Sequence, residues 1–146
     1  SIKSYELRSS ASFVICAMHR LIWMLLLTLT TACMDQTYYQ YADGSANVYV
    51  LTSDSLEYIP VKPEESSTGF YSGGDPKKVA ITPQQFRMIS AMFETVKTKH
   101  EIHLPDRIKT SGMITTFNGT EKNSIIIKPG SQQMMQIEKE LKELLN

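Results

Sequence analysis

His100, Glu101, His103 and Asp106 form the densest cluster of side chains that could bind a metal or move a proton. Successive side chains of an extended strand point to opposite faces, so the imidazoles of His100 and His103 would diverge there. A zinc-binding helix of the His-Glu-x-x-His type brings both imidazoles to one face, but the spacing here is shorter. Apart from His19, the chain has no other histidine to complete a zinc site. We therefore expect a solvated strand end without a metal, and keep a hydrolase or metal-handling protein that uses this segment as the alternative.

The segment Lys62–Lys78 is a candidate ligand-binding loop because it is long and contains proline and glycine around two aromatic side chains. Long connections in compact domains are often functional. The residues that could contact a ligand are Phe70, Tyr71, Gly73 and Gly74. The alternative is that the two aromatic residues form a short edge strand. The glycines lack the lysine spacing of a phosphate-binding loop, so we expect no nucleotide site.

Other classes of chemistry have no support in the sequence. No Gly-x-Ser-x-Gly pattern is present for a serine nucleophile, and both cysteines, Cys16 and Cys33, lie in the N-terminal part of the chain. Lys and Arg number 15, as do Asp and Glu, so the formal net charge is +0 and no basic face for nucleic acid is implied. We expect no catalytic residue, no cofactor and no nucleic-acid partner.

The stretch His19–Cys33 has the pattern of an export signal, with basic residues, an apolar stretch and small residues before a cysteine. Its end, Leu29–Cys33, resembles the signal of bacterial lipoproteins, in which the cysteine is diacylated and becomes the mature N-terminus. The resemblance implies that Cys33 is lipidated and that the protein is anchored to the inner or outer membrane of a bacterial cell envelope. The alternatives are an ordinary cleaved signal and an anchor helix over residues 11–32, in which the central Arg20 opposes insertion.

This leader divides the chain into three parts. Residues 1–32 are predicted to be the signal peptide together with upstream sequence, since Met18 is a natural start. Residues 33–45 are predicted to be a lipidated tether, because they are polar and poor in aliphatic side chains. Tyrosines in this tether could instead begin the first strand. Residues 46–146 are predicted to form a single domain.

Ser55 is a candidate for modification. Asp54-Ser55-Leu56 resembles the short motif on which Bacteroidota attach O-glycans to exported proteins. It falls in a predicted hairpin turn, where an exposed hydroxyl could accept a sugar. Asn118-Gly119-Thr120 also fits an N-glycan sequon, but Asn-Gly is a common tight turn and we interpret it so.

Strands and helices alternate in groups along the predicted domain. Strands are expected over 46–52, 56–61, 78–81, 102–104, 107–117 and 124–128, and helices from Thr82 and from Ser131. The connection between the last two strands is either a two-residue turn at Asn118-Gly119 or a longer loop through Lys122. This order predicts an α+β fold with an antiparallel sheet of about four to six strands and two helices on one face.

The sequence thus predicts a lipid-anchored envelope protein that binds and does not catalyse. The predicted partners are the membrane, through the N-terminal lipid, and an envelope protein or a saccharide. A subunit that stabilises a larger membrane complex is a third interpretation. Nothing in the residue pattern selects one ligand.

Overall fold

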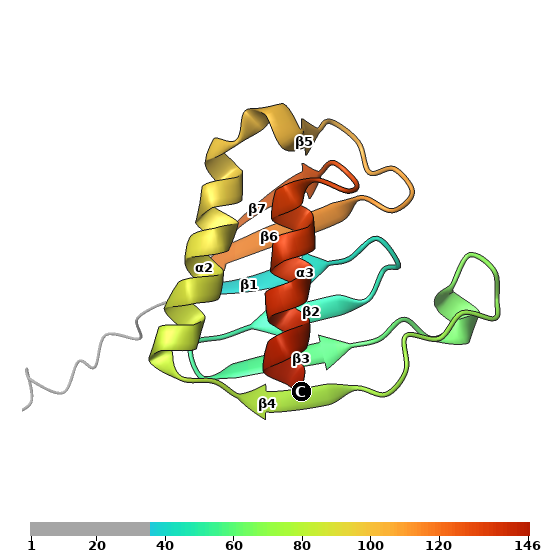
Figure 1. Cartoon of the computed structure of the whole chain (residues 1–146), viewed down its shortest axis with the longest axis horizontal. Helices are drawn as coiled ribbons and strands as arrows, with labels where there is room; N and C mark the ends of the chain where they lie inside the picture. The colour runs from blue at the N-terminus through green and yellow to red at the C-terminus, as the bar shows by residue number, and fades with distance from the viewer. Residues whose placement is uncertain (1–35) are drawn as a thin grey trace, which may run out of the picture. The chain divides into compact units, whose positions relative to one another are not determined.

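A seven-stranded sheet with two α-helices on one face forms the described part of the chain (Figure 1). The computed structural model describes residues 36–146. The sheet order is β4-β3-β2-β1-β6-β7-β5, and each neighbouring pair is antiparallel. The elements are β1 (Tyr38–Ala42), β2 (Val48–Leu51), β3 (Ser55–Ile59), the 3-10 turn η1 (Pro63–Glu65), β4 (Lys77–Ala80), α2 (Pro83–Thr98), the 3-10 turn η2 (His100–Ile102), β5 (His103–Leu104), β6 (Gly112–Asn118), β7 (Glu121–Ile127) and α3 (Gln132–Leu145). The α+β class is confirmed, with more strands than expected.

The additional strand is β1, and it overturns the predicted tether over 33–45. Strand β1 lies in the middle of the sheet, between β2 and β6. Tyr39 and Tyr41 are buried against the helices. Low aliphatic content suggested a tether, but alternate tyrosines supply the buried area that aliphatic side chains supply elsewhere. The domain therefore includes Tyr38 and does not begin at residue 46.

Both helices begin where local capping predicts. Thr82 accepts a hydrogen bond from the backbone N–H of Gln85, whose side chain accepts one from the backbone N–H of Thr82. Ser131 accepts a hydrogen bond from the backbone N–H of Met134 in the same way. These contacts satisfy donors that a helix start leaves open. The buried faces of the two helices then pack on the sheet through Ile89, Phe93, Val96, Met134, Ile137, Leu141 and Leu145.

Tight turns set the register of the two hairpins that the sequence predicted. In the β6–β7 hairpin, Asn118 pairs with Glu121, so the connection is a two-residue turn at Gly119-Thr120, one residue later than the predicted Asn118-Gly119, and the longer loop is wrong. Gly119 has a φ of 59°, which this kind of turn favours. In the β2–β3 hairpin, Leu51 pairs with Leu56.

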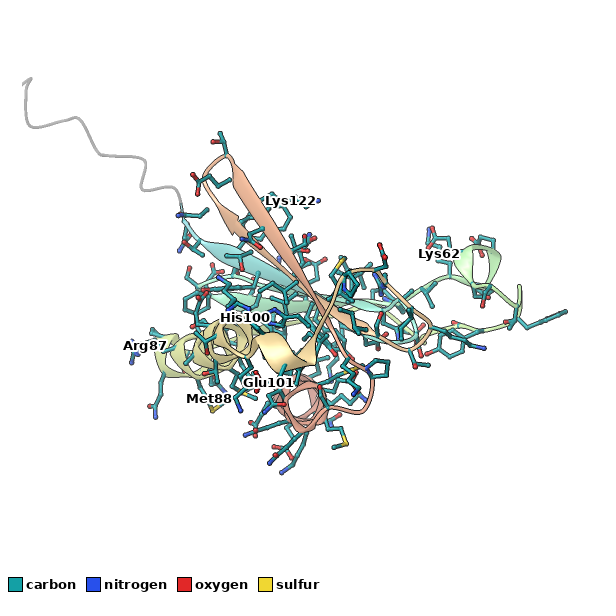
Figure 2. All side chains as sticks on the ribbon, turned by 90° about the horizontal axis from the view of Figure 1, so that it is seen from above. Lys62, Arg87, Met88, His100, Glu101 and Lys122 are labelled. Atoms are coloured by element: carbon teal, nitrogen blue, oxygen red, sulfur yellow. The ribbon has the colours of Figure 1, made fainter. Side chains whose placement is uncertain are left out.

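Three connections gather at one end of the sheet. They are the β1–β2 loop, the long β3–β4 loop and the β5–β6 loop, which lie at the right of the sheet in Figure 1. Seen from above, both helices lie on one side of the sheet, and the long loop at Lys62 extends away from it (Figure 2). Within residues 36–146, no helix is long and apolar enough to cross a membrane. The gathered loops are the part of the domain where distant segments meet.

Candidate functional site

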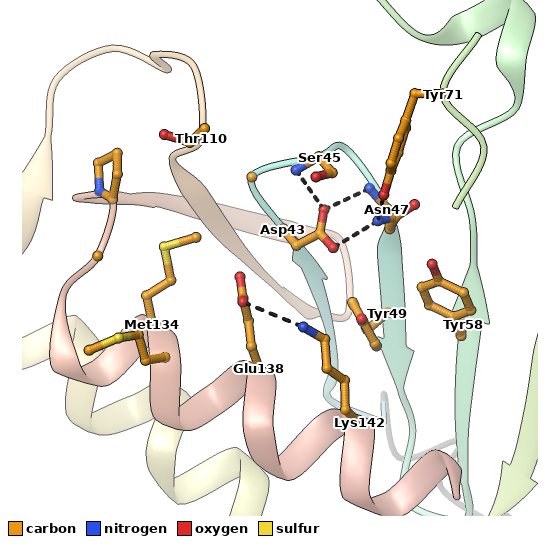
Figure 3. A pocket seen from close by; sticks show the side chains of 14 residues that line it. Asp43, Ser45, Asn47, Tyr49, Tyr58, Tyr71, Thr110, Met134, Glu138 and Lys142 are labelled. Carbon is orange, nitrogen blue, oxygen red and sulfur yellow. Dashed lines mark hydrogen bonds and ion pairs between the residues drawn. The ribbon is translucent and has the colours of Figure 1, made fainter. Parts of the chain in front are cut away.

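The β1–β2 loop is organised by the carboxylate of Asp43, which is 8% exposed. Its Oδ1 accepts hydrogen bonds from the backbone N–H groups of Ser45 (2.8 Å) and Asn47 (2.9 Å), and its Oδ2 accepts one from Asn47 Nδ2 (2.9 Å; Figure 3). These bonds hold Ala46 at a φ of 70°, a backbone conformation that residues other than glycine, asparagine and aspartate rarely adopt. We refer to this arrangement as the Asp43–Asn47 pair.

The side-chain amide of Asn47 also connects the pair to the long loop. Asn47 Oδ1 accepts a hydrogen bond from the backbone N–H of Val61 (3.1 Å), and Nδ2 also donates to the hydroxyl of Tyr71 (3.3 Å). Tyr58 donates its hydroxyl hydrogen to the carbonyl of Gly73 (2.7 Å). A Cβ at Gly73 would lie 2.0 Å from Asn47 Oδ1, so a residue with a side chain does not fit against the amide without a shift.

The same β1–β2 loop also contacts the β5–β6 loop. Arg107 donates from Nη2 to the carbonyl of Asp43 (3.1 Å). A Cβ at Gly44 would lie 2.7 Å from the carbonyl oxygen of Thr110, so the two backbones touch. The Asp43–Asn47 pair therefore holds the point where all three loops meet.

Two adjacent hollows open at this meeting point. The first hollow, of about 500 Å³, lies between the β1–β2 loop and α3 (Figure 3). The second hollow, of about 440 Å³, lies between the β1–β2 loop and the long loop. They share the lining residues Gly44, Ser45, Tyr71 and Thr110. We call the two together the paired hollows.

Tyr49 places a hydroxyl group without a partner on the wall of the first hollow. Its side chain is 3% exposed and packs 5.0 Å from the ring of Tyr58. No hydrogen bond joins the hydroxyl to another of the described residues. Burial, together with the charges of Asp43 and Glu138, raises the pKa of Tyr49 well above its ordinary value. The group therefore stays an O–H donor at neutral pH.

Glu138 brings a carboxylate into the first hollow from α3. Its Oε1 accepts a hydrogen bond from the buried Tyr41 hydroxyl (3.0 Å), and its Oε2 lies 3.8 Å from Lys142 Nζ (Figure 3). Burial and the nearby Glu138 charge raise the pKa of Tyr41 far above its ordinary value. Among residues 36–146, the ion-pair partner of Oε2 is this Lys142 ammonium group, and Oε2 can also accept a hydrogen bond from a ligand.

The four loop residues predicted to bind a ligand divide between different roles. Neither Phe70 nor Tyr71 lies in a strand, so the alternative of a short edge strand at these two residues is wrong. Phe70 is 91% exposed and lines neither hollow, whereas Tyr71 lines both. Gly73 packs against Asn47, and Gly74 has a φ of 93°, which glycine adopts readily.

The histidine cluster differs from its predicted strand geometry. His100 and Glu101 lie in the 3-10 turn η2, beside the end of α2 and well apart from Lys62 in Figure 2. This turn brings the rings of His100 and His103 to a centroid distance of 5.1 Å, so the predicted divergence is wrong. His103 Nε2 lies 2.8 Å from the carbonyl oxygen of Val96. Among residues 36–146, no three His, Cys, Asp or Glu side chains are grouped to hold a metal.

Of the two predicted modification sites, the structure describes one. Cys33 lies outside the described residues. Ser55 is the first residue of β3, where its Oγ lies 2.8 Å from Thr52 Oγ1 and the side chain is half-buried. O-glycosylation at Ser55 stays a prediction.

The site residues absent from the sequence prediction include Asp43, Asn47, Tyr49 and Glu138. The signal for the first two was an Asp and an Asn that flank a glycine-containing turn between two aromatic segments, a pattern in which short side chains bond the turn backbone. Tyr49 and Glu138 fall on alternating strand and helix patterns and had no distinguishing signal.

No protein-family model, curated protein sequence or solved structure matches this chain. The functional argument therefore depends on the geometry of the paired hollows.

The buried tyrosines predict a loss of stability in alkali. Burial and the hydrogen bond to Glu94 raise the pKa of Tyr39 to about 12, against about 10 in an unfolded chain. The folded state keeps this proton where the unfolded state loses it, so the free energy of unfolding falls as pH rises through that window. Urea unfolding at successive pH values should show this fall, and Tyr39→Phe should make it less steep. An unchanged slope in the variant would contradict the assignment.

Proposed function

We propose that this protein is a lipid-anchored, non-enzymatic binding module of the bacterial cell envelope, and that its ligand is an oligosaccharide held in the paired hollows. The observation that carries the proposal is that the two hollows are adjacent, with Gly44, Ser45, Tyr71 and Thr110 on the walls of both. A linear chain of sugar units can occupy both hollows, whereas a single small molecule needs only one. The combined space is of the size that small-molecule sites use.

The walls of the paired hollows suit a ligand rich in hydroxyl groups. The second hollow is lined with hydroxyl side chains from three loops: Ser45, Ser66, Ser67, Thr68 and Thr110. Hydroxyl groups both donate and accept hydrogen bonds, as sugar hydroxyls do. Tyr71 is 42% exposed where the hollows join, so its ring can stack against the apolar face of a sugar.

The carboxylates of the first hollow favour binding over hydrolysis. Glycoside hydrolysis commonly uses two carboxyl groups that exchange protons with the ligand or attack it. Asp43 is occupied by hydrogen bonds from three N–H groups of its own loop. Glu138 remains as one accessible carboxylate, which can bind a ligand but lacks a free partner for acid–base chemistry.

Lipid anchoring is supported by the export signal and its terminal Cys33. If Cys33 carries the lipid, the four residues between it and Tyr38 allow a separation of at most about 18 Å between these two residues. The sheet would then begin close to the membrane surface, without the longer tether expected from the sequence. The paired hollows lie past Ala42, at the other end of β1, and a site on an anchored domain suits a ligand that is part of the envelope.

Replacing Tyr71 with Ala should weaken oligosaccharide binding by about tenfold, because it removes the ring shared by both hollows. Isothermal titration calorimetry of the full chain with a β-1,4-linked glucose oligomer measures this, in a detergent that has no sugar headgroup. Phe70→Ala is the matched control, since Phe70 is the adjacent aromatic residue and lines neither hollow. Equal losses in the two variants, or no binding of neutral oligosaccharides by the parent, would contradict the proposal.

Cys33→Ser should abolish incorporation of labelled fatty acid and release the protein from membranes, because the lipid supplies the anchor. Labelling in a bacterial host, followed by membrane fractionation, measures both effects. Cys16→Ser should leave label and membrane attachment unchanged. A Cys33→Ser product that stays in the membrane fraction would favour the anchor helix over residues 11–32.

A further inference from the structure

The first hollow differs from the second in its charge. Asp43 and Glu138 place two carboxylates on its wall, against the single ammonium group of Lys142. The second hollow has one charged side chain of each sign, Glu65 and Lys109. The first hollow therefore favours a positively charged group on the part of the ligand that enters it.

Lys142 is a weak internal partner for Glu138. Its side chain is 60% exposed and its Nζ lies 3.8 Å from Glu138 Oε2, whereas the Glu138 side chain is 24% exposed. Exposed ion pairs at this separation contribute little, because solvent screens them and the long lysine side chain loses freedom. Lys142 can turn to solvent at low cost and leave Oε2 to a ligand.

The hydroxyl of Tyr49 is a second polar group on the wall of the same hollow, independent of the carboxylates. The Tyr49 residue is 3% exposed and its hydroxyl has no hydrogen-bond partner among residues 36–146, so the group is free to bond to a ligand in the hollow. The titratable groups around it are Tyr41 and Tyr58, whose rings pack against its ring from the neighbouring strands, and Asp43, Tyr71 and Glu138, which line the same hollow. Tyr49 and Glu138 line the same hollow from the sheet and from α3, respectively.

We infer that the first hollow binds the protonated amine of an amino-sugar unit, with Glu138 exchanging Lys142 for the ligand and Tyr49 Oη accepting a second hydrogen bond. A protonated amine has three N–H donors, and Glu138 Oε2 and Tyr49 Oη supply two acceptors. The adjacent tyrosine rings add an attraction for the positive charge. This inference rests on the proposed function, since the sugar chain continues into the second hollow.

Three β-1,4-linked oligomers of equal length test the inference, because they differ only at C2: a hydroxyl in the glucose oligomer, an acetamide in the N-acetylglucosamine oligomer and an amine in the glucosamine oligomer. Calorimetry of the full chain, at a pH where the amine is protonated, should show the amine form bound at least about tenfold more tightly than the other two. Equal affinities would overturn the inference and leave the proposed function in place. No binding of any form would overturn both.

Two substitutions on α3 should change the preference for the amine form over the glucose oligomer in opposite directions. Glu138→Gln keeps an acceptor for Tyr41 but loses the charge, so the affinity for the amine form should fall to that for the glucose oligomer. Lys142→Met removes the competing ammonium group, so the amine form alone should bind more tightly. Glu143→Gln is the matched control, because Glu143 lies on the same helix and does not line the hollow. A preference that survives Glu138→Gln would overturn the inference.

Spermidine, which carries amines and no sugar ring, tests whether the sugar chain contributes to binding of the amine. Weak binding of spermidine relative to the glucosamine oligomer is expected, because it forms no contacts with the hydroxyl groups of the second hollow. Binding of equal strength would show an amine site to which the sugar chain contributes nothing, and would overturn the assignment to an amino sugar. If Glu138→Gln does not fold, the tightening expected in Lys142→Met still decides the outcome.

Discussion

The buried hydrogen bonds between Asp43 and Asn47 are the interaction on which the functional end of this domain depends. The carboxylate holds the β1–β2 loop closed, and the amide joins this loop to Val61 and Tyr71 of the long loop. A buried carboxylate is tolerated only where hydrogen bonds replace its water, and three N–H groups do so here. Without them the walls of both hollows would lose their common support.

The sheet supplies the rigid base for this junction. Tyr41 is fully buried in β1, yet its hydroxyl reaches Glu138 of α3 at the edge of the first hollow. A tyrosine in the core can thus fix the position of a carboxylate that faces solvent. Tyr39 forms the equivalent contact with Glu94 of α2. The sheet tyrosines therefore pack the core and also orient acidic side chains of the two helices that cover it.

Features encoded over a few residues could be predicted from the sequence, and features that need distant segments could not. The caps at Thr82 and Ser131 and the turn at Gly119 are local, and the structure has the caps as expected and the turn within one residue. The low aliphatic content of residues 33–45 predicts a tether, whereas the burial of β1 depends on partners in β2 and β6, which the segment itself does not reveal. The predicted binding loop contained Tyr71, but the paired hollows also need the β1–β2 loop, Thr110 and one face of α3. That assembly is set by sheet order and register, which residue spacing alone does not give.

Amide hydrogen exchange in an Asn47→Ala variant tests most directly whether the Asp43–Asn47 pair holds the loops together. Loss of the amide leaves buried acceptor capacity on Asp43 and frees the backbone N–H of Val61, at a cost of about 1–3 kcal/mol. The account predicts that Val61 and the amides of the β1–β2 loop exchange much faster in the variant, while the amides of β6 and β7 stay protected. Unchanged exchange at Val61 and Ser45 would show that the loops are held by other contacts, and would contradict the account.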